Sequence, residues 1–125
     1  MSETIENLRP AIVYKILPAA HWTKARKIGA FDGSDDDLRD GYIHLSGPTQ
    51  VIGTLQKYFL GQQDLLLVAF RASDLGLNLK WEPSRSGQAF PHLYEPLKTR
   101  LALWQKALAL GPNGIPIVEE AWLAC

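Results

Sequence analysis

Several segments of the chain have the apolar patterns of β-strands. The segment AIVYKIL at 11–17 is β-branched and aromatic. The segment DLLLVAFRA at 64–72 is a continuous apolar run, as in a strand that is buried on both faces. Three shorter segments also favour an extended chain with alternate side chains on opposite faces. They are GYIHLSG at 41–47, LNLKWE at 77–82 and FPHLYEPL at 90–97.

Two further segments have the spacing of helices that pack one face against a core. In 18–29, Pro18 suits the first turn of a helix and Gly29 is a natural end. The residues that would pack inward there are Trp22, Ala25 and Ile28. In 46–61, Ser46 is a candidate N-cap, Pro48 suits the first turn and Gly61 ends the helix. The apolar stripe of this second helix is Val51, Ile52, Leu55, Tyr58 and Phe59.

The acidic segment FDGSDDDLRDG at 31–41 separates the first helix from the strand at 41–47. Ser34 followed by three aspartates is typical of the start of one helical turn, where carboxylates lie near the positive end of the helix dipole. A Mg²⁺ or Ca²⁺ site is the alternative. The EF-hand pattern is absent, and three adjacent aspartates do not all point at one ion. We therefore favour a solvated turn, and we predict no metal site.

The segment RLALWQKALAL at 100–110 is ambiguous on local signals, because its composition favours a helix while the GPNG turn after it favours a hairpin. The order of strands and helices predicts an α+β fold in one compact domain. We expect a loose tail at 1–10 and a single domain at 11–125.

Alternation along the short strands places polar and aromatic side chains on shared faces. Tyr42, His44 and Ser46 share one face of 41–47, opposite Ile43 and Leu45. In the two later strands, Lys80 and Glu82 share a face, and so do Phe90, His92 and Tyr94. A cleft lined by such groups would stack a planar ring and hydrogen-bond a sugar or phosphate. A histidine there could also act as an acid or base near neutral pH.

Each of these residues also has a structural interpretation. A lone histidine in a strand is more often hydrogen-bonded for structure, and Ser46 is most simply an N-cap. In the structural interpretation, Glu82 does no more than form a surface ion pair with Lys80 or Arg85. The sequence has no GxSxG elbow, P-loop or GxGxxG motif, and nothing in it signals a third group that would orient His44 and Ser46 as a hydrolase. Arg85, in SRSGQAF, is a weak candidate for a phosphate contact.

Composition narrows the class of protein. Thirteen basic and thirteen acidic residues balance, which argues against a dedicated nucleic-acid binder. Cys125 is the only cysteine, so no disulfide forms within the chain, and the three histidines lack metal-ligand spacing. With no apolar signal segment and no apolar run near the ~20 residues of a membrane span, we expect a cytoplasmic protein.

Taken together in order and spacing, several of these segments resemble one family. They are IVYKI, the pattern ending in DGYIHLS, the YF.G..DLLLV segment and LKWE.SR.G..FPHLY. The chain over roughly 11–110 is similar to the bacterial family called domain of unknown function 952, which in turn resembles the ADP-ribosyltransferase fold. That resemblance implies two small, mostly antiparallel sheets around an NAD-binding cleft, with two or three helices, and makes 100–110 a strand.

The same resemblance implies roles for individual residues. In transferases with a His-Tyr-Glu signature, the histidine binds a ribose of NAD⁺, the tyrosine stacks on nicotinamide and the glutamate assists transfer. His44 and Glu82 match the histidine and glutamate and are the predicted catalytic residues, while Tyr58 or Tyr94 would be the tyrosine. Arg85, Lys98 or Arg100 could hold a phosphate, as in RNA 2′-phosphotransferases of this fold. The predicted ligand-binding residues are Tyr42, His44, Ser46, Arg85, His92 and Tyr94.

Two classes of function stay open from the sequence. One is an NAD-dependent ADP-ribosyltransferase or glycohydrolase. The other is a non-enzymatic module that binds a nucleotide or another small molecule in the same cleft. RNA 2′-phosphotransferase chemistry is less favoured, because the overall charge is neutral.

Overall fold

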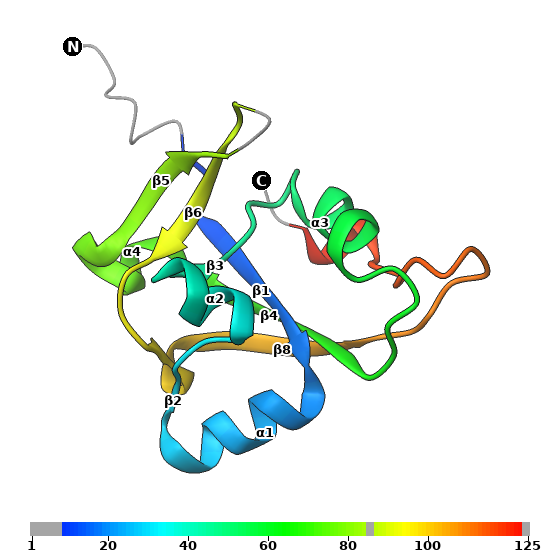
Figure 1. Cartoon of the computed structure of the whole chain (residues 1–125), viewed down its shortest axis with the longest axis horizontal. Coiled ribbons are helices and arrows are strands. Elements are labelled where there is room, and N and C mark those ends of the chain that lie inside the picture. The colour runs from blue at the N-terminus through cyan, green and yellow to red at the C-terminus, as the bar shows by residue number, and fades with distance from the viewer. Residues whose placement is uncertain (1–8, 85–86, 124–125) are drawn as a thin grey trace.

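The computed structural model describes residues 9–84 and 87–123. Most of the predicted N-terminal tail, Arg85 and Cys125 therefore lie outside the described residues. Within them the fold is α+β, with three antiparallel sheets and four short α-helices (Figure 1). No helix in this part of the chain is long and apolar enough to cross a bilayer.

The central sheet is formed by β1 (Ile12–Pro18), β4 (Leu65–Arg71) and β8 (Ala102–Leu108), with β4 in the middle. As predicted, β4 is buried on both faces. Its alternate residues enter two different apolar cores, one with Leu66, Val68 and Phe70 and the other with Leu65, Leu67 and Ala69.

The strand assignment for 100–110 is confirmed over Ala102–Leu108. This segment has helix-favouring residues, but it pairs with β4 from Leu108 opposite Leu65 to Ala102 opposite Phe70. Pairing with a fully buried strand satisfies its backbone groups, so the tertiary context outweighs the local propensity.

The expectation of two sheets is wrong, because the structure has three. β3 (Ile43–His44), β6 (Ala89–Leu93) and β5 (Leu79–Pro83) form a second sheet, with β6 in the middle. β2 (Ala30–Phe31) pairs with β7 (Leu97–Lys98) in a third. The predicted segment 90–97 is divided between two sheets, because β6 ends at Leu93 and β7 begins at Leu97.

The expectation of two or three helices is also too low, because the SDLG segment expected to be a turn contains α4 (Ala72–Leu75). α1 (Ala19–Ile28) ends at Gly29, which adopts a left-handed conformation (φ 103°), as predicted. It buries Trp22 and Ala25, whereas Ile28, the last residue of the helix, is 67% exposed. Pro18 is the last residue of β1 and the N-cap residue of α1, so it lies just before the first turn and not in it.

α3 (Val51–Tyr58) begins later than predicted, and Ser46 does not cap it. The backbone of Ser46 instead exchanges two hydrogen bonds with Tyr14 of β1, and the Gln50 side chain accepts from the Gly47 amide. Ser46 is thereby joined to β1, and residues 48–50 form a turn in which the Gln50 amide donates to the Gly47 carbonyl. Val51 and Leu55 of α3 then pack on the core that contains Leu65 and Leu67, while Ile52 and Tyr58 are exposed.

α2 (Asp35–Asp40) is the helical turn predicted from the acidic segment. Ser34 is its N-cap and forms a capping box: its hydroxyl accepts from the Asp37 amide, and the Asp37 carboxylate accepts from the Ser34 amide. The expectation of a fully solvated turn is wrong for Asp37, which is only 2% exposed. Figure 1 shows α2 in front of β3, with the β5–β6 hairpin on one side of it.

Candidate functional site

Two histidines face each other across the second sheet. In the antiparallel pairing of β3 and β6, His44 lies opposite His92 and Ile43 lies opposite Leu93. The apolar pair points into the core, so the two imidazoles share the other face. Their ring centroids are 5.7 Å apart in an edge-to-face arrangement.

Tyr42 joins these two rings into one cluster. Its ring stacks on His92 with 4.0 Å between centroids and 21° between planes, and it lies 4.7 Å from His44. The centroid of the Tyr94 ring is 5.3 Å from that of Tyr42. The stripe that the sequence predicts for two separate strands is therefore a single aromatic and imidazole surface.

Both ring nitrogens of His44 contact carboxylates. Nδ1 is 2.6 Å from Oδ1 of Asp37, and Nε2 is 2.9 Å from Oδ2 of Asp40. Since carboxylates only accept hydrogen bonds, both contacts are hydrogen bonds when both ring nitrogens carry protons. This arrangement therefore suits the imidazolium form of His44.

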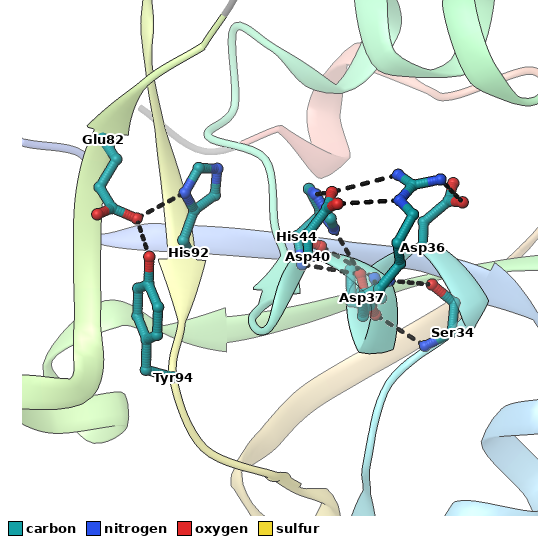
Figure 2. A network of polar contacts seen from close by, with 10 residues as sticks. Ser34, Asp36, Asp37, Asp40, His44, Glu82, His92 and Tyr94 are labelled. Atoms are coloured by element: carbon teal, nitrogen blue, oxygen red, sulfur yellow. Dashed lines mark hydrogen bonds and ion pairs between the residues drawn. The ribbon is translucent and has the colours of Figure 1, made fainter.

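Asp37 is the buried anchor of this group (Figure 2). Its carboxylate accepts from Nζ of Lys15 at 3.0 Å, from the amides of Ser34 and His44, and from the His44 ring. Burial by itself raises the pKa of Asp37. The hydrogen bond from His44, the charge of Lys15 and the two amides outweigh burial and hold that pKa well below its usual range.

Lys15 is the cationic partner of Asp37 and is itself buried in the middle of β1. Its ammonium also donates to the His44 carbonyl at 3.0 Å and lies 5.6 Å from the centre of the Phe31 ring. Burial lowers the pKa of Lys15, while the carboxylate of Asp37 opposes that shift. The pair ties β1, α2 and β3 together beneath the two histidines.

The depressed pKa of Asp37 predicts a specific loss of stability in acid. Because the ionised carboxylate is favoured in the folded state, its contribution is complete above about pH 5 and falls as the pH drops through and below the unfolded value of about 4. We expect the difference in unfolding free energy between the wild type and Asp37→Asn to be largest near neutral pH and to shrink toward pH 2. Urea unfolding at several pH values measures this difference; a constant gap would contradict the assignment.

A second carboxylate holds the other imidazole. Oε1 of Glu82 is 2.8 Å from Nδ1 of His92 and accepts from the Tyr94 hydroxyl at 2.6 Å. The hydrogen bond from Tyr94 and, after it, the one from His92 lower the pKa of Glu82. The hydrogen bond to Glu82 raises the pKa of Tyr94 to about 12. Glu82 thus pairs with His92 and Tyr94, and not with Lys80 as the surface interpretation has it.

The contact with Glu82 fixes the proton of neutral His92 on Nδ1. Within the described residues Nε2 of His92 has no hydrogen-bond partner, and it is not sealed from solvent. Figure 2 shows this nitrogen directed away from Glu82. His92 is therefore arranged to accept a proton or a hydrogen bond at Nε2.

These groups border a cleft of about 670 Å³ between α2, α3 and the strands β1, β3 and β6. Tyr42, His44, Ser46 and His92 line it, so the structure brings together four of the predicted ligand-binding residues. Ser46 is buried there, and its hydroxyl lies 3.0 Å from that of Thr54. Three cationic residues, Lys15, Arg39 and Lys57, also line the cleft, and Lys15 among them is paired with Asp37.

The other predicted residues lie elsewhere. Tyr94 and Glu82 are not among the residues that line the cleft. Tyr94 contacts Tyr42, which lines it, and Glu82 contacts His92, which also lines it. Tyr58 lines the cleft, whereas Lys98 and Arg100 are exposed outside the lining, Lys98 beside β2. Arg85 lies outside the described residues. Over residues 9–84 and 87–123, no group of three or more histidine, cysteine or acidic side chains is arranged to hold a metal ion.

The sequence prediction missed Asp37, Asp40 and Lys15. One signal was present: Lys15 is a single charge inside the apolar run 12–17, and a lysine that is buried needs a partner. Nothing local identifies that partner as Asp37, which is 22 positions away.

Comparisons with known proteins identify a family and similar solved structures. The model of a family described as "Protein of unknown function (DUF952)" matches residues 16–105. The chain belongs to this family. No curated protein matches the chain.

Solved structures of the Caulobacter crescentus protein CC0527 are similar to this chain. Its crystal structure is 46% identical, covers 85% of this chain and 93% of that one, and superposes with a TM-score of 0.83. Its solution NMR structure, also 46% identical, covers 85% and 91% and gives a TM-score of 0.77. The DUF952 fold of this chain thus has an experimental counterpart, while its activity has to be argued from the cleft.

Proposed function

We propose that the cleft binds a nucleotide ligand, with NAD⁺ as the first candidate. The protein would break the glycosidic bond between nicotinamide and ribose and pass the ADP-ribosyl group to water or to an acceptor. The observation that carries this proposal is the cross-strand pair of His44 and His92, each held by a carboxylate and both in contact with Tyr42 at the cleft wall. The resemblance to the ADP-ribosyltransferase fold suggests the class of ligand.

The cleft offers the chemistry that such a ligand needs. A volume of about 670 Å³ lies within the usual range for small-molecule sites. Tyr42 and Phe90 provide aromatic surfaces for a planar ring, and Thr49 provides a hydroxyl for a sugar. Arg39 and Lys57 supply positive charge for phosphates.

The two histidines would have different roles. Nε2 of His92 is available to take a proton from an attacking water or acceptor hydroxyl, with Glu82 holding the ring and stabilising its charged form. His44, whose ring lies between Asp37 and Asp40, suits binding of an electron-rich oxygen when it is protonated. In this proposal Glu82 is a positioning residue, which acts through His92.

Binding of NAD⁺ is testable without knowing the reaction. We expect millimolar NAD⁺ to raise the melting temperature, because a ligand that binds only the folded state stabilises it. His44→Ala should abolish this shift. His21→Ala should leave it unchanged, because His21 is exposed on α1 and outside the cleft. Differential scanning fluorimetry measures the effect, and no shift in the wild type would contradict the proposal.

A binding module without turnover is the second candidate. It is favoured by the contacts of His44, whose ring has no nitrogen left for proton transfer. The two candidates differ in product formation. Release of nicotinamide from NAD⁺ would support the enzyme, whereas a thermal shift without any release would support the binding module.

A further inference from the structure

The two carboxylates on His44 differ in how firmly they are held. Asp37 is buried and accepts four hydrogen bonds from three residues, including Lys15. The Asp40 side chain is 30% exposed and lines the cleft, and among the described residues its one partner besides His44 is Arg39. Arg39 is itself 67% exposed. The contact of His44 with Asp37 is therefore part of the fold, while the contact with Asp40 can exchange.

The location of Asp40 also favours its release. It is the last residue of α2, where the helix dipole disfavours a negative charge. Gly41 follows in a left-handed conformation (φ 85°), so the chain turns away from the helix directly after it. A movement of the Asp40 side chain leaves the buried contacts of Asp37 intact.

Asp40 pairs with both Arg39 and the His44 ring, while Asp37 pairs with Lys15 and Asp36 pairs with Arg39. When Asp40 moves away from Nε2, its negative charge leaves that part of the cleft, and Nε2, when protonated, can donate to another acceptor. Asp37 stays and keeps that donor oriented.

We infer that Asp40 occupies the subsite of an anionic ligand oxygen, and that a phosphate oxygen of the ligand displaces it from Nε2 of His44. Arg39 then loses Asp40 as a partner. It lines the same cleft and can pair with the bound anion. This inference rests on the proposed function for the identity of the whole ligand, but it concerns only the anionic part.

The direct test uses inorganic pyrophosphate as the probe and Asp40→Asn as the variant. The substitution removes the competing charge, so we expect affinity for pyrophosphate to rise by about fivefold or more. Asp35→Asn is the matched control, because Asp35 is exposed on the same helix and lies outside the lining of the cleft. It should change the affinity by less than about twofold. NMR titration of the His44 ring nitrogens would report displacement at Nε2.

The outcomes separate this inference from the proposed function. Unchanged or weaker pyrophosphate binding in Asp40→Asn would overturn the inference, as would an equal gain in Asp35→Asn. Tighter pyrophosphate binding without any binding of NAD⁺ would support the anion subsite and contradict the proposed ligand. NAD⁺ binding with the same affinity in the wild type and Asp40→Asn would support the proposed ligand and contradict the anion subsite at Asp40.

Discussion

Replacing Asp37 by alanine should lower the free energy of unfolding by about 3–5 kcal/mol, because it leaves Lys15 as an unpaired charge in the interior. The ammonium of Lys15 would keep only the His44 carbonyl as an acceptor. The same change removes the carboxylate half of the capping box of α2 and the acceptor for the His44 ring. Urea unfolding followed by circular dichroism measures the loss.

Two variants show whether the buried pair causes that loss. Asp36→Ala removes an exposed carboxylate one residue earlier and should change stability by less than about 0.5 kcal/mol. In Lys15→Met combined with Asp37→Ala, the unpaired charge is absent, so the loss should be smaller than the sum of the two single effects. Strict additivity would mean that the two residues act independently, contrary to the structure.

Replacing His92 by alanine should lower the rate of nicotinamide release from NAD⁺ by about 100-fold to 10,000-fold, the usual contribution of a general base. The effect should fall on kcat rather than KM, since the proton transfer occurs only in the chemical step. Glu82→Gln should cause a smaller loss, because the amide still lies beside Nδ1 but no longer stabilises the charged ring. Steady-state kinetics over a range of pH measures both.

The control for this experiment is Tyr94→Phe, which removes one hydrogen bond to Glu82 and leaves the contact of Glu82 with His92. We expect its rate to stay within about tenfold of the wild type, as expected for the loss of one hydrogen bond. A His92→Ala variant with the kcat of the wild type would exclude His92 as the base. Folding of each variant is checked by its melting temperature.

Local patterns predicted much of the fold, because they reflect which face of each element is buried. The apolar run at 64–72 identified β4, and the alternation in 41–47 placed Ile43 and Leu45 inside and Tyr42 and His44 outside. The prediction was wrong where a segment has two local preferences and packing chooses between them. Ser46 has the chemistry of an N-cap, yet its backbone pairs with Tyr14, so α3 begins five residues later.

The candidate site was predicted in part. Alternation found Tyr42, His44 and His92, because a strand's period directly determines which side chains share a face. It could not find that His44 lies opposite His92, because the register of β3 and β6 depends on pairing between segments distant in the chain. It also left Asp37 as one of three equivalent aspartates, whereas packing of α2 against β1 and β3 buries only that one.

Local periodicity and residue order were enough to predict most of the longer strands, the chemical character of the short strand faces and the resemblance to the DUF952 family. The tertiary structure decided how the charges pair. Lys15 joins Asp37 across 22 positions and Glu82 joins His92 across ten, since antiparallel pairing and the packing of α2 bring these groups within hydrogen-bond distance. Those pairings give both ring nitrogens of His44 a carboxylate partner and leave Nε2 of His92 without a hydrogen-bond partner among the described residues, a difference between two histidines that no local pattern contains.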